Sequence, residues 1–450
     1  MPEMVFTQEI AAEVLQNIEE EVISAKEALR KRFSKEKVDY KIRGSVHAYV
    51  METLKRRNAI DLLINLCLEN KKVDDLKPFI RNLLRIGIYE MLYKNVPPPL
   101  ATDSAVRIAK RRFGKGAAAL VNAVMRKAER INLKEEIEKI KKEDRIGYLA
   151  LKYFHPDWFV KYTIDLLGEK QAIELMIADV ENQPVYVRVN ELKTSIESVR
   201  KYLEENGVVI QETPLPEVFR VLSYVKPPAA LEWHNKGYYI IQDLASAFVS
   251  HVLKPEPGET ILDLAAAPGS KTSHIAMLME NKGKIIAVDN SAERLKRMKV
   301  KMKILGVKNV EYALADGARF SAGEVDRVLI DPPCSSTGTL RTHPCVKWRY
   351  DPAKYRATIT IQRKMLKNAF RNLKEGGLAV YSTCSLTFEE NEENILYASE
   401  FFRVETIDAR IGTRGITEFR GKNFPFWDKV IRTYPHMHNC SGFFISKLLK

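Results

Sequence analysis

The chain has 450 residues, of which 45% are hydrophobic and 29% charged, a composition that predicts a folded protein and excludes global disorder. This length exceeds that of a typical single domain, so roughly two or three domains are expected. Lysine and arginine number 72 against 58 acidic residues, and the resulting formal charge of +14 favours a polyanionic partner.

Hydropathy and cysteine usage narrow the class of protein further. No apolar run approaches the roughly 18 residues of a membrane helix, which excludes a transmembrane protein. The N-terminus carries Glu3, Glu9 and Glu13 where a signal peptide needs basic residues, so we expect a cytoplasmic protein. The five cysteines are far apart and form no C-x-x-C pair, so the sequence predicts neither a metal site nor a disulfide framework.

The first 145 residues or so are predicted to be helical. Apolar residues between Asp75 and Lys94 recur at the spacing of a helix with one buried face. Two further helices are predicted over residues 101–113 and 116–131, joined at Gly114. Basic residues gather at this junction and on the second helix: Lys110, Arg111, Arg112, Lys115, Arg126, Lys127 and Arg130. A solvated helix face is the simpler interpretation of such a run, and RNA contact is the alternative.

The middle of the chain predicts a small α/β unit. A linker helix is expected over residues 134–145, and Val185–Val189 alternates like a strand. Thr194-Ser195-Ile196-Glu197 is typical of a capping box, opening a helix that ends at Asn206. A second strand is expected over residues 208–210.

From about residue 240, short apolar strands alternate with helices. Strands are predicted over residues 260–264, 284–289, 310–315, 327–330 and 378–383, and helices over residues 271–280, 291–305 and 355–373. This alternation is typical of a Rossmann-like α/β domain with a mostly parallel sheet, whose ligand binds at the carboxyl ends of the strands. The three predicted domains are therefore residues 1–145, 146–239 and 240–450.

Candidate ligand-binding residues follow successive strands. The loop Ala265-Ala266-Ala267-Pro268-Gly269-Ser270-Lys271 has small side chains that let a ligand approach the backbone, and a helix N-terminus that can receive a carboxylate. It matches neither G-x-G-x-x-G nor a Walker A loop. Asp289 can accept hydrogen bonds from ribose hydroxyls, and Asp316 can meet an adenine amine. A lone Asp could instead cap a helix, but three sites at successive strand ends favour a nucleoside-like ligand.

Two cysteine motifs follow the last two of these strands. Asp331-Pro332-Pro333-Cys334-Ser335-Ser336-Thr337-Gly338 follows the fourth, and Ser382-Thr383-Cys384-Ser385 ends the fifth. These strands are expected to be neighbours, so both thiols would face one cleft. A thiolate there could act as a nucleophile, and a transient disulfide is the alternative. The usual role of a buried small hydrophobe is expected for two other cysteines, Cys67 and Cys440.

These motifs resemble those of the Sun/RsmB (Fmu) family of RNA cytosine-5 methyltransferases. The loop at 265–271 is similar to the family's cofactor loop, and the two cysteine motifs are similar to its paired motifs. Residues 242–246, 435–436 and 442–444 also resemble family patterns. Residues 1–130 resemble a NusB-like RNA-binding domain, most clearly between Ala105 and Arg126.

The resemblance implies a multidomain protein with an all-α NusB-like domain, a small α/β domain and a methyltransferase domain with a mostly parallel seven-stranded sheet. It implies S-adenosylmethionine as cofactor, held by the 265–271 loop, Asp289, Arg294, Asp316 and Asp331. Cys384 would attack carbon 6 of a flipped cytosine and Asp331 would bind its nitrogen 3 edge. Cys334 would assist loss of the carbon 5 proton. The basic helical domain would contact RNA phosphates.

Some residues depart from the family pattern. Ser270 replaces a glycine of the cofactor loop, Pro332 stands where alanine is common, and Ser336 where glycine is common. Cys345 lies in a segment where an acidic residue is expected, and it is a candidate third thiol near the site. These changes bear on substrate fit more than on reaction type.

Three other functions remain to be weighed. A DNA cytosine-5 methyltransferase lacks the second cysteine motif, and an amino-group methyltransferase usually has an aromatic residue in place of Cys334. A non-catalytic RNA-binding assembly factor would not need the cofactor loop or both cysteines. Small-subunit ribosomal RNA is the expected substrate, with transfer RNA as the alternative, and the protein is expected to be a monomer.

Overall fold

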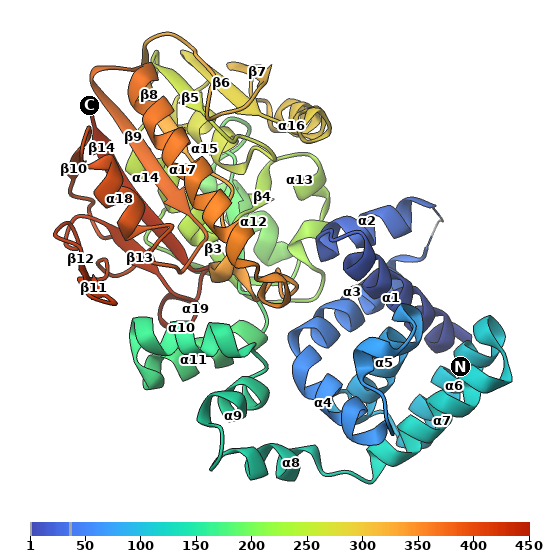
Figure 1. Cartoon of the computed structure of the whole chain (residues 1–450). Helices are drawn as coiled ribbons and strands as arrows, with labels where there is room; N and C mark the ends of the chain where they lie inside the picture. Colours follow the sequence, from blue (N-terminus) through green and yellow to red (C-terminus); the bar gives the residue numbers. More distant parts are fainter. Residues whose placement is uncertain (1, 36–37) are drawn as a thin grey trace. The chain divides into compact units, whose positions relative to one another are not determined.

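The computed structural model of the protein describes residues 2–35 and 38–450 (Figure 1). The chain forms two compact units. One consists of Met1–Glu181 with Leu340–Arg349, and the other of Asn182–Thr339 with Tyr350–Lys450. None of the helices in the described parts of the chain has both the length and the apolar character of a membrane span.

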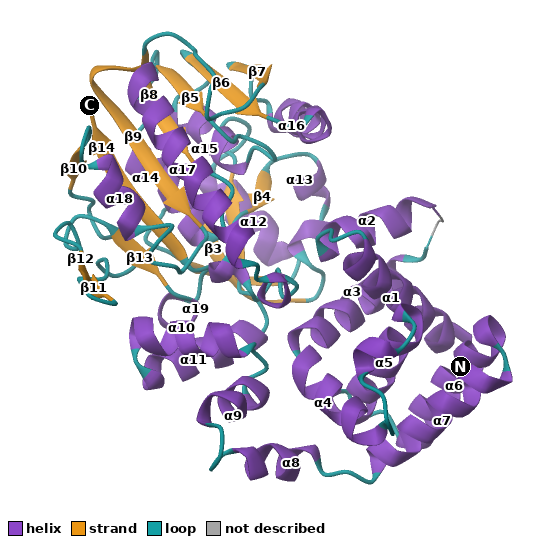
Figure 2. Cartoon of the chain, in the orientation of Figure 1, coloured by secondary structure: helices purple, strands orange, loops and turns teal. Residues whose placement is uncertain are grey.

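The first unit is built from helices, as the sequence predicts (Figure 2). They are α1 (Pro2–Glu20), α2 (Ala25–Lys35), α3 (Tyr40–Lys55), α4 (Arg57–Cys67), α5 (Pro78–Tyr93), α6 (Pro98–Phe113), α7 (Lys115–Glu129), α8 (Leu133–Ile140), α9 (Arg145–Lys152), α10 (Asp157–Leu167) and α11 (Glu169–Val180).

Two features of this unit show why the sequence pattern predicts its helices: the start of α5 and the break between α6 and α7. Pro78 lies in the first turn of α5, where its missing N–H costs no hydrogen bond, and Leu83 and Leu84 are buried on its inner face. Gly114 separates α6 from α7 with a φ of +84°, a conformation that favours glycine. The predicted linker helix is shorter than expected, because α8 ends at Ile140.

A four-stranded antiparallel sheet opens the second unit. Its strands are β1 (Val185–Val189), β2 (Val208–Glu212), β3 (Val218–Tyr224) and β4 (Tyr239–Ile241), in the order β2-β3-β1-β4. The two predicted strands correspond to β1 and β2. The sequence pattern missed β4, which is too short to show a period, and β3, whose pairing with β1 joins segments far apart in the chain.

The helix of this small sheet, α12 (Ile196–Glu205), begins one residue later than the predicted capping box requires. Ser195 is the N-cap, and its hydroxyl accepts from the backbone N–H of Ser198. Glu197 is therefore the second helical residue rather than the third, so the predicted box is wrong. The predicted helix itself is confirmed.

The large sheet of the second unit is formed where the sequence predicted strands alternating with helices. Its strands are β5 (Thr260–Asp263), β6 (Lys284–Asp289), β7 (Val310–Leu314), β8 (Val325–Ile330), β9 (Leu373–Thr383), β10 (Arg403–Glu405), β13 (Ile431–Thr433) and β14 (Phe443–Leu449). Seven strands follow the order β10-β14-β9-β8-β5-β6-β7, and β13 pairs with β14. The sheet therefore has eight strands, not the expected seven. Strands β5 to β9 are parallel, which confirms a mostly parallel Rossmann-like core.

Helices cover this sheet and fix the loops at its carboxyl edge. They are α14 (Leu244–Leu253), α15 (Ser270–Leu278), α16 (Ala292–Leu305), α17 (Pro352–Asn372) and α18 (Glu392–Ala398). Two shorter helices complete the second unit: α13 (Glu232–Asn235), which contacts β4 of the small sheet, and α19 (Pro435–His438). A small ribbon joins β11 (Glu418–Phe419) to β12 (Lys422–Asn423). Figure 1 shows α14 and α17 on opposite faces of β8 and β9.

Candidate active site

The two cysteine motifs meet because β8 and β9 are adjacent parallel strands, as predicted. The loop after β8 carries Cys334, and the turn after β9 carries Cys384. Their sulfur atoms lie 3.3 Å apart. The hydroxyl of Ser336 lies 3.5 Å from the sulfur of Cys384, so a polar side chain accompanies the pair.

The environment separates the two thiols in acidity. The hydrogen bond between the thiols, the largest influence on each, lowers the pKa of Cys384 and raises that of Cys334. Burial opposes the first shift and reinforces the second, and the charge of Lys271 further lowers the pKa of Cys384. Cys384 is therefore the more acidic thiol of the pair, which is the order that a nucleophilic Cys384 requires.

Asp331 and Lys271 form an ion pair beside the thiols. The ammonium of Lys271 donates to Asp331 Oδ2 at 2.7 Å, and the hydroxyl of Ser382 donates to Oδ1 at 3.0 Å. Burial acts to lower the pKa of Lys271, but the adjacent Asp331 outweighs it and the pKa rises. Lys271 therefore remains a cation next to Cys384.

The small-residue loop joins β5 to α15, where the sequence places it. The backbone N–H of Ala266 donates to the carbonyl of Val288 at 2.8 Å, which ties the loop to β6. Gly269 has a φ of +91°, and a Cβ there would stand 2.7 Å from the terminal methyl of Met302. The positive φ favours glycine, and a Cβ would also displace the side chains of Met298 and Met302 on α16.

The two acids predicted to bind the ligand have different surroundings. Asp289 is buried, and its carboxylate accepts from the backbone N–H groups of Ala267 and Ser291 and pairs with Arg294 at 3.2 Å. Arg294 also donates to the carbonyl of Ala267, so this cluster fixes the loop. The side chain of Asp316 is 59% exposed, and its carboxylate accepts from the backbone N–H of Ala318 at 2.9 Å and lies 3.8 Å from Arg319.

The sequence analysis did not single out three buried groups of this region, Asp263, Glu390 and Asn391. Asp263 ends β5 and accepts from the hydroxyl of Thr272 at 2.7 Å, and burial raises its pKa to about 7. Glu390 and Asn391 follow the second cysteine motif and bond to residues beside both thiols. Their signal in the sequence is an acidic run at residues 389–393, which is more often a solvated helix face.

Two glycines let the C-terminal segment approach the site. The N–H of Gly338 donates to the carbonyl of Cys384 at 2.9 Å, and the N–H of Gly442 donates to the carbonyl of Gly338 at 2.8 Å. A Cβ on Gly338 would stand 2.0 Å from the carbonyl oxygen of Gly442. A Cβ on Gly442 would in turn stand 2.8 Å from the Cα of Gly338, so the close approach of the two segments gives a physical reason for glycine at both positions.

The other three cysteines are buried. Cys67 lies in α4, and burial raises its pKa to about 11. Cys440 belongs to the apolar core between α14, β9 and β14. Cys345 is 3% exposed and lies in the segment Leu340–Arg349, which packs within the first unit. It lines a cavity there with Ile18, Leu54 and Trp348.

Part of the predicted basic cluster on α6 and α7 is already paired within its unit. Arg111 pairs with Glu9, and Arg112 pairs with Glu9 and Glu13. Other members of the cluster have exposed side chains, namely Lys110, Lys115, Arg126, Lys127 and Arg130. The cluster thus contains both structural and solvent-facing cations.

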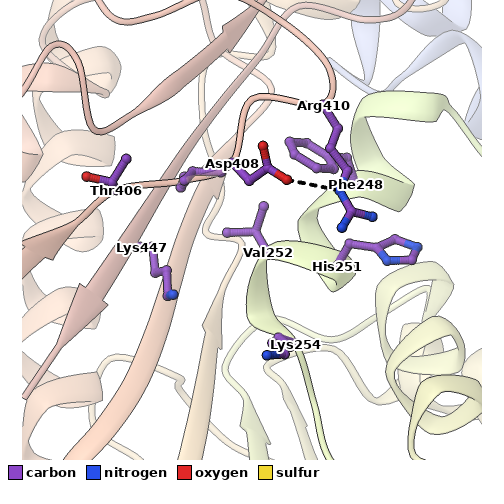
Figure 3. Close-up of a pocket in the computed structure, with 9 residues that line it drawn as sticks. Phe248, His251, Val252, Lys254, Thr406, Asp408, Arg410 and Lys447 are labelled. Atoms are coloured by element: carbon purple, nitrogen blue, oxygen red, sulfur yellow. Dashed lines mark hydrogen bonds and ion pairs between the residues drawn. The ribbon is translucent and has the colours of Figure 1, made fainter. Parts of the chain in front are cut away.

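A separate cavity of about 400 Å³ lies between α14 and the segment after β10 (Figure 3). Its lining residues are Phe248, His251, Val252, Lys254, Thr406, Ile407, Asp408, Arg410 and Lys447. Nε2 of His251 lies 2.7 Å from Oε1 of Glu217, and Nε2 of His274 lies 3.1 Å from the same oxygen. Burial acts to raise the pKa of Glu217, but the two imidazoles prevail and lower it. The lining residues differ from those predicted for catalysis or cofactor binding.

Three family models match successive parts of the chain. Residues 250–449 match the 16S rRNA methyltransferase RsmB/F model, residues 6–130 the NusB family, and residues 155–226 the ferredoxin-like domain of RsmF/B-like methyltransferases. These matches confirm the resemblance drawn from the sequence.

Individual proteins extend the comparison along the chain. A probable ribosomal RNA small subunit methyltransferase B from Synechocystis is 31% identical over 89% of this chain and 90% of its own length. The human 28S rRNA (cytosine(4447)-C(5))-methyltransferase is 35% identical over 70% of this chain and 40% of its own length. The crystal structure of PH0851 covers 99% of both chains with a TM-score of 0.82 and 28% identity.

Proposed function

The chain belongs to the RsmB/F family of ribosomal RNA methyltransferases, and from this we propose that it forms 5-methylcytosine in small-subunit ribosomal RNA with S-adenosylmethionine as methyl donor. The observation that carries the proposal is the pair of thiols 3.3 Å apart, with Cys384 the more acidic. A relative named for cytosine C5 methylation supports the position of the methyl group.

The residues after β5, β6 and β7 suit a nucleoside that carries an amino-acid arm. Ala265–Ala267 leave room at the backbone, the first turn of α15 offers free N–H groups, and Asp316 presents an exposed carboxylate. Asp289 and Arg294 hold the loop in shape, and Lys271 and Asp331 close the side that faces the thiols. When bound, the cofactor supplies an electrophilic methyl group.

Cys384 is the proposed nucleophile. Carbon 5 of cytosine is a weak nucleophile, and a bond from the sulfur of Cys384 to carbon 6 moves electron density onto carbon 5. Carbon 5 then takes the methyl group, loses its proton, and the bond between sulfur and carbon 6 breaks. The lowered pKa of Cys384 favours the thiolate that begins this sequence.

Asp331 and Cys334 have supporting parts in this proposal. Asp331 is held by Lys271 and Ser382 at the edge of the site, where it can bind the nitrogen 3 edge of the base. Loss of the carbon 5 proton must accompany release of Cys384, and the neighbouring Cys334 is placed to assist it.

RNA binding would use the N-terminal part of the chain. The target base must leave its stack to reach Cys384, so phosphate contacts elsewhere have to hold the strand. The match of residues 6–130 to the NusB family and the exposed cations of α6 and α7 support residues 1–145 as the RNA-binding domain. Residues 146–239 would link it to the catalytic domain, residues 240–450.

A methylation assay with labelled S-adenosylmethionine tests this proposal on small-subunit ribosomal RNA and transfer RNA transcripts. Wild-type protein should produce 5-methylcytosine in the ribosomal transcript. Cys384→Ala should give neither product nor a covalent complex on a denaturing gel, whereas Cys334→Ala should accumulate the complex.

Two outcomes would change the proposal. Methylation of transfer RNA alone would show that transfer RNA, and not ribosomal RNA, is the substrate. A covalent complex with Cys384→Ala but not with Cys334→Ala would reverse the two cysteines and show the mechanism to be of the DNA-methyltransferase type.

A further inference from the structure

Glu390 is a fully buried carboxylate that holds the loop of Cys334. Its Oε1 accepts from the backbone N–H of Ser335 at 2.8 Å and from Nε2 of Gln362 at 2.9 Å. Its Oε2 accepts from the hydroxyl of Ser335 at 2.5 Å and from that of Thr387 at 2.9 Å. Four hydrogen bonds of this kind satisfy a buried charge, and two of them fix the residue that follows Cys334.

Asn391, the next residue, holds the turn of Cys384 in a similar way. Its Oδ1 accepts from the hydroxyl of Thr383 at 2.6 Å, and its Nδ2 donates to the carbonyl of Ser385 at 2.9 Å. The side chain therefore bridges the residues before and after Cys384. It is fully buried, so water does not compete for either bond.

The backbone around this pair is itself anchored. The carbonyl of Glu390 accepts from the hydroxyl of Tyr381 at 2.7 Å and from Nδ2 of Asn394 at 3.1 Å. Glu392 forms a buried ion pair with Arg432, whose Nη1 donates to the carbonyl of Leu386 at 2.9 Å. Residues 390 and 391 thus lie in a rigid segment that reaches both cysteine motifs.

We propose that Glu390 and Asn391 are positioning residues, which hold the Cys334 loop and the Cys384 turn so that the two thiols stay in contact. The inference rests on the proposed function for its catalytic consequence, but the geometry it describes exists without RNA. The two loops also bond directly to each other, from the N–H of Gly338 to the carbonyl of Cys384 at 2.9 Å and between the hydroxyls of Ser335 and Ser385 at 2.9 Å. Glu390 and Asn391 add a second support, because each bonds to the immediate neighbours of one cysteine.

The test compares Glu390→Ala with Glu390→Gln and with a control, Glu389→Gln. Glutamine can still accept from the Ser335 N–H and donate to the two hydroxyls, so it should restore most of what alanine removes. Glu389 is adjacent in sequence and accepts from the hydroxyl of Tyr355 at 3.1 Å, on α17. Thr383→Val deletes the hydroxyl that donates to Asn391 and that also accepts from the backbone N–H of Ser385 at 3.2 Å. Asn391→Ala keeps the bond between Ser385 and Thr383, so it is compared with Thr383→Val to test the second half of the proposal.

Two readouts separate positioning from stability. The first is methylation, where Glu390→Ala should lower kcat about 100-fold and leave KM for RNA and for S-adenosylmethionine unchanged. The second readout needs no substrate and is the rate at which Cys334 and Cys384 form a disulfide. The oxidant diamide takes two protons and two electrons from the two thiols, and mass spectrometry of the linked peptides measures the product. Disulfide formation should be about tenfold slower or more in Glu390→Ala and in Thr383→Val than in the wild-type protein. It should proceed at the wild-type rate in Glu389→Gln.

Each possible result either supports or contradicts the positioning role of Glu390. The proposal is overturned if the folded Glu390→Ala variant closes the disulfide at the wild-type rate, or if KM rises while kcat is unchanged. If Glu390→Ala does not fold, Glu390→Asp keeps the carboxylate but shortens the side chain, and it should slow disulfide formation in the same direction. If wild-type protein methylates no RNA but the variants still slow disulfide closure, the proposed function fails and the positioning role stands.

Discussion

The ammonium of Lys271 and the carboxylate of Asp331 are 2.7 Å apart, although they come from different strand-to-helix loops of the large sheet. Lys271 opens α15 after β5, and Asp331 follows β8. Because β5 and β8 are neighbours, this ion pair joins the cofactor loop to the first cysteine motif. The pair therefore links the part of the site predicted to bind the methyl donor with the part predicted to bind the base.

Replacing Asp331 by asparagine should break this link while keeping the shape of the side chain. Lys271 would lose its partner in a site where its side chain is only 12% exposed, so unfolding free energy should fall by about 1–3 kcal/mol. Methyl transfer should fall about 100-fold or more, because the nitrogen 3 edge of the base loses its charged partner. Urea unfolding and single-turnover methylation measure the two effects, and Asp326→Asn at the start of β8 is the control. A variant with wild-type turnover would contradict the role given to Asp331.

The two thiols should differ in their alkylation by iodoacetamide as pH rises. Thiolates are the reactive form, and the pKa of Cys384 lies below its usual range while that of Cys334 lies above it. Cys384 should therefore react at lower pH than Cys334. Replacing Lys271 by methionine removes a charge that lowers the pKa of Cys384, so reaction at neutral pH should slow. Peptide mass spectrometry from pH 6 to pH 10 would follow both sites, and earlier labelling of Cys334 would refute the order.

Much of this site could be predicted because its signals are local. The strand Lys284–Asp289 was predicted with the boundaries that the structure has, since a short apolar run between turn signals defines it. The meeting of Cys334 and Cys384 followed from the expected adjacency of two parallel strands. Both predictions needed only the sequence and the topology that its alternation implies.

Other features depend on contacts that no local pattern records. No local pattern predicted that the carboxylate of Asp289 accepts from the backbone N–H groups of Ala267 and Ser291, and its contact with a ribose stays a prediction. Glu390 stands in an acidic run typical of a solvated helix face, and only its burial against Ser335 reveals its role. The strands β10, β13 and β14 were not predicted from the sequence pattern, and β10 and β13 have only three residues each, too few to show a period. The expected seven strands were implied by the family resemblance.

Asp263 should make stability depend on pH. Burial raises its pKa to about 7, above the value of about 3.9 in an unfolded chain, so the folded state binds the proton more tightly. Its contribution is therefore present at low pH and is lost as pH rises toward 7. Relative to Asp263→Asn, wild-type protein should lose about 2–3 kcal/mol of unfolding free energy between pH 5 and pH 8. Urea titrations at four pH values test this, and parallel stability profiles would show that Asp263 is ionised throughout.

The cations of α6 and α7 should divide into two classes in RNA binding. Lys115 and Arg126 face solvent, so replacing either by alanine should weaken binding at low salt and reduce the slope of log affinity against log salt by about 0.7–1. Arg112 instead pairs with Glu9 and Glu13, and its replacement should cost about 1 kcal/mol of unfolding free energy with a smaller change in that slope. Filter binding of a small-subunit RNA fragment from 50 to 300 mM salt, with thermal melts in parallel, measures both. Equal slopes for the wild-type protein and the Lys115 and Arg126 variants would show that RNA binds at a surface other than α6 and α7.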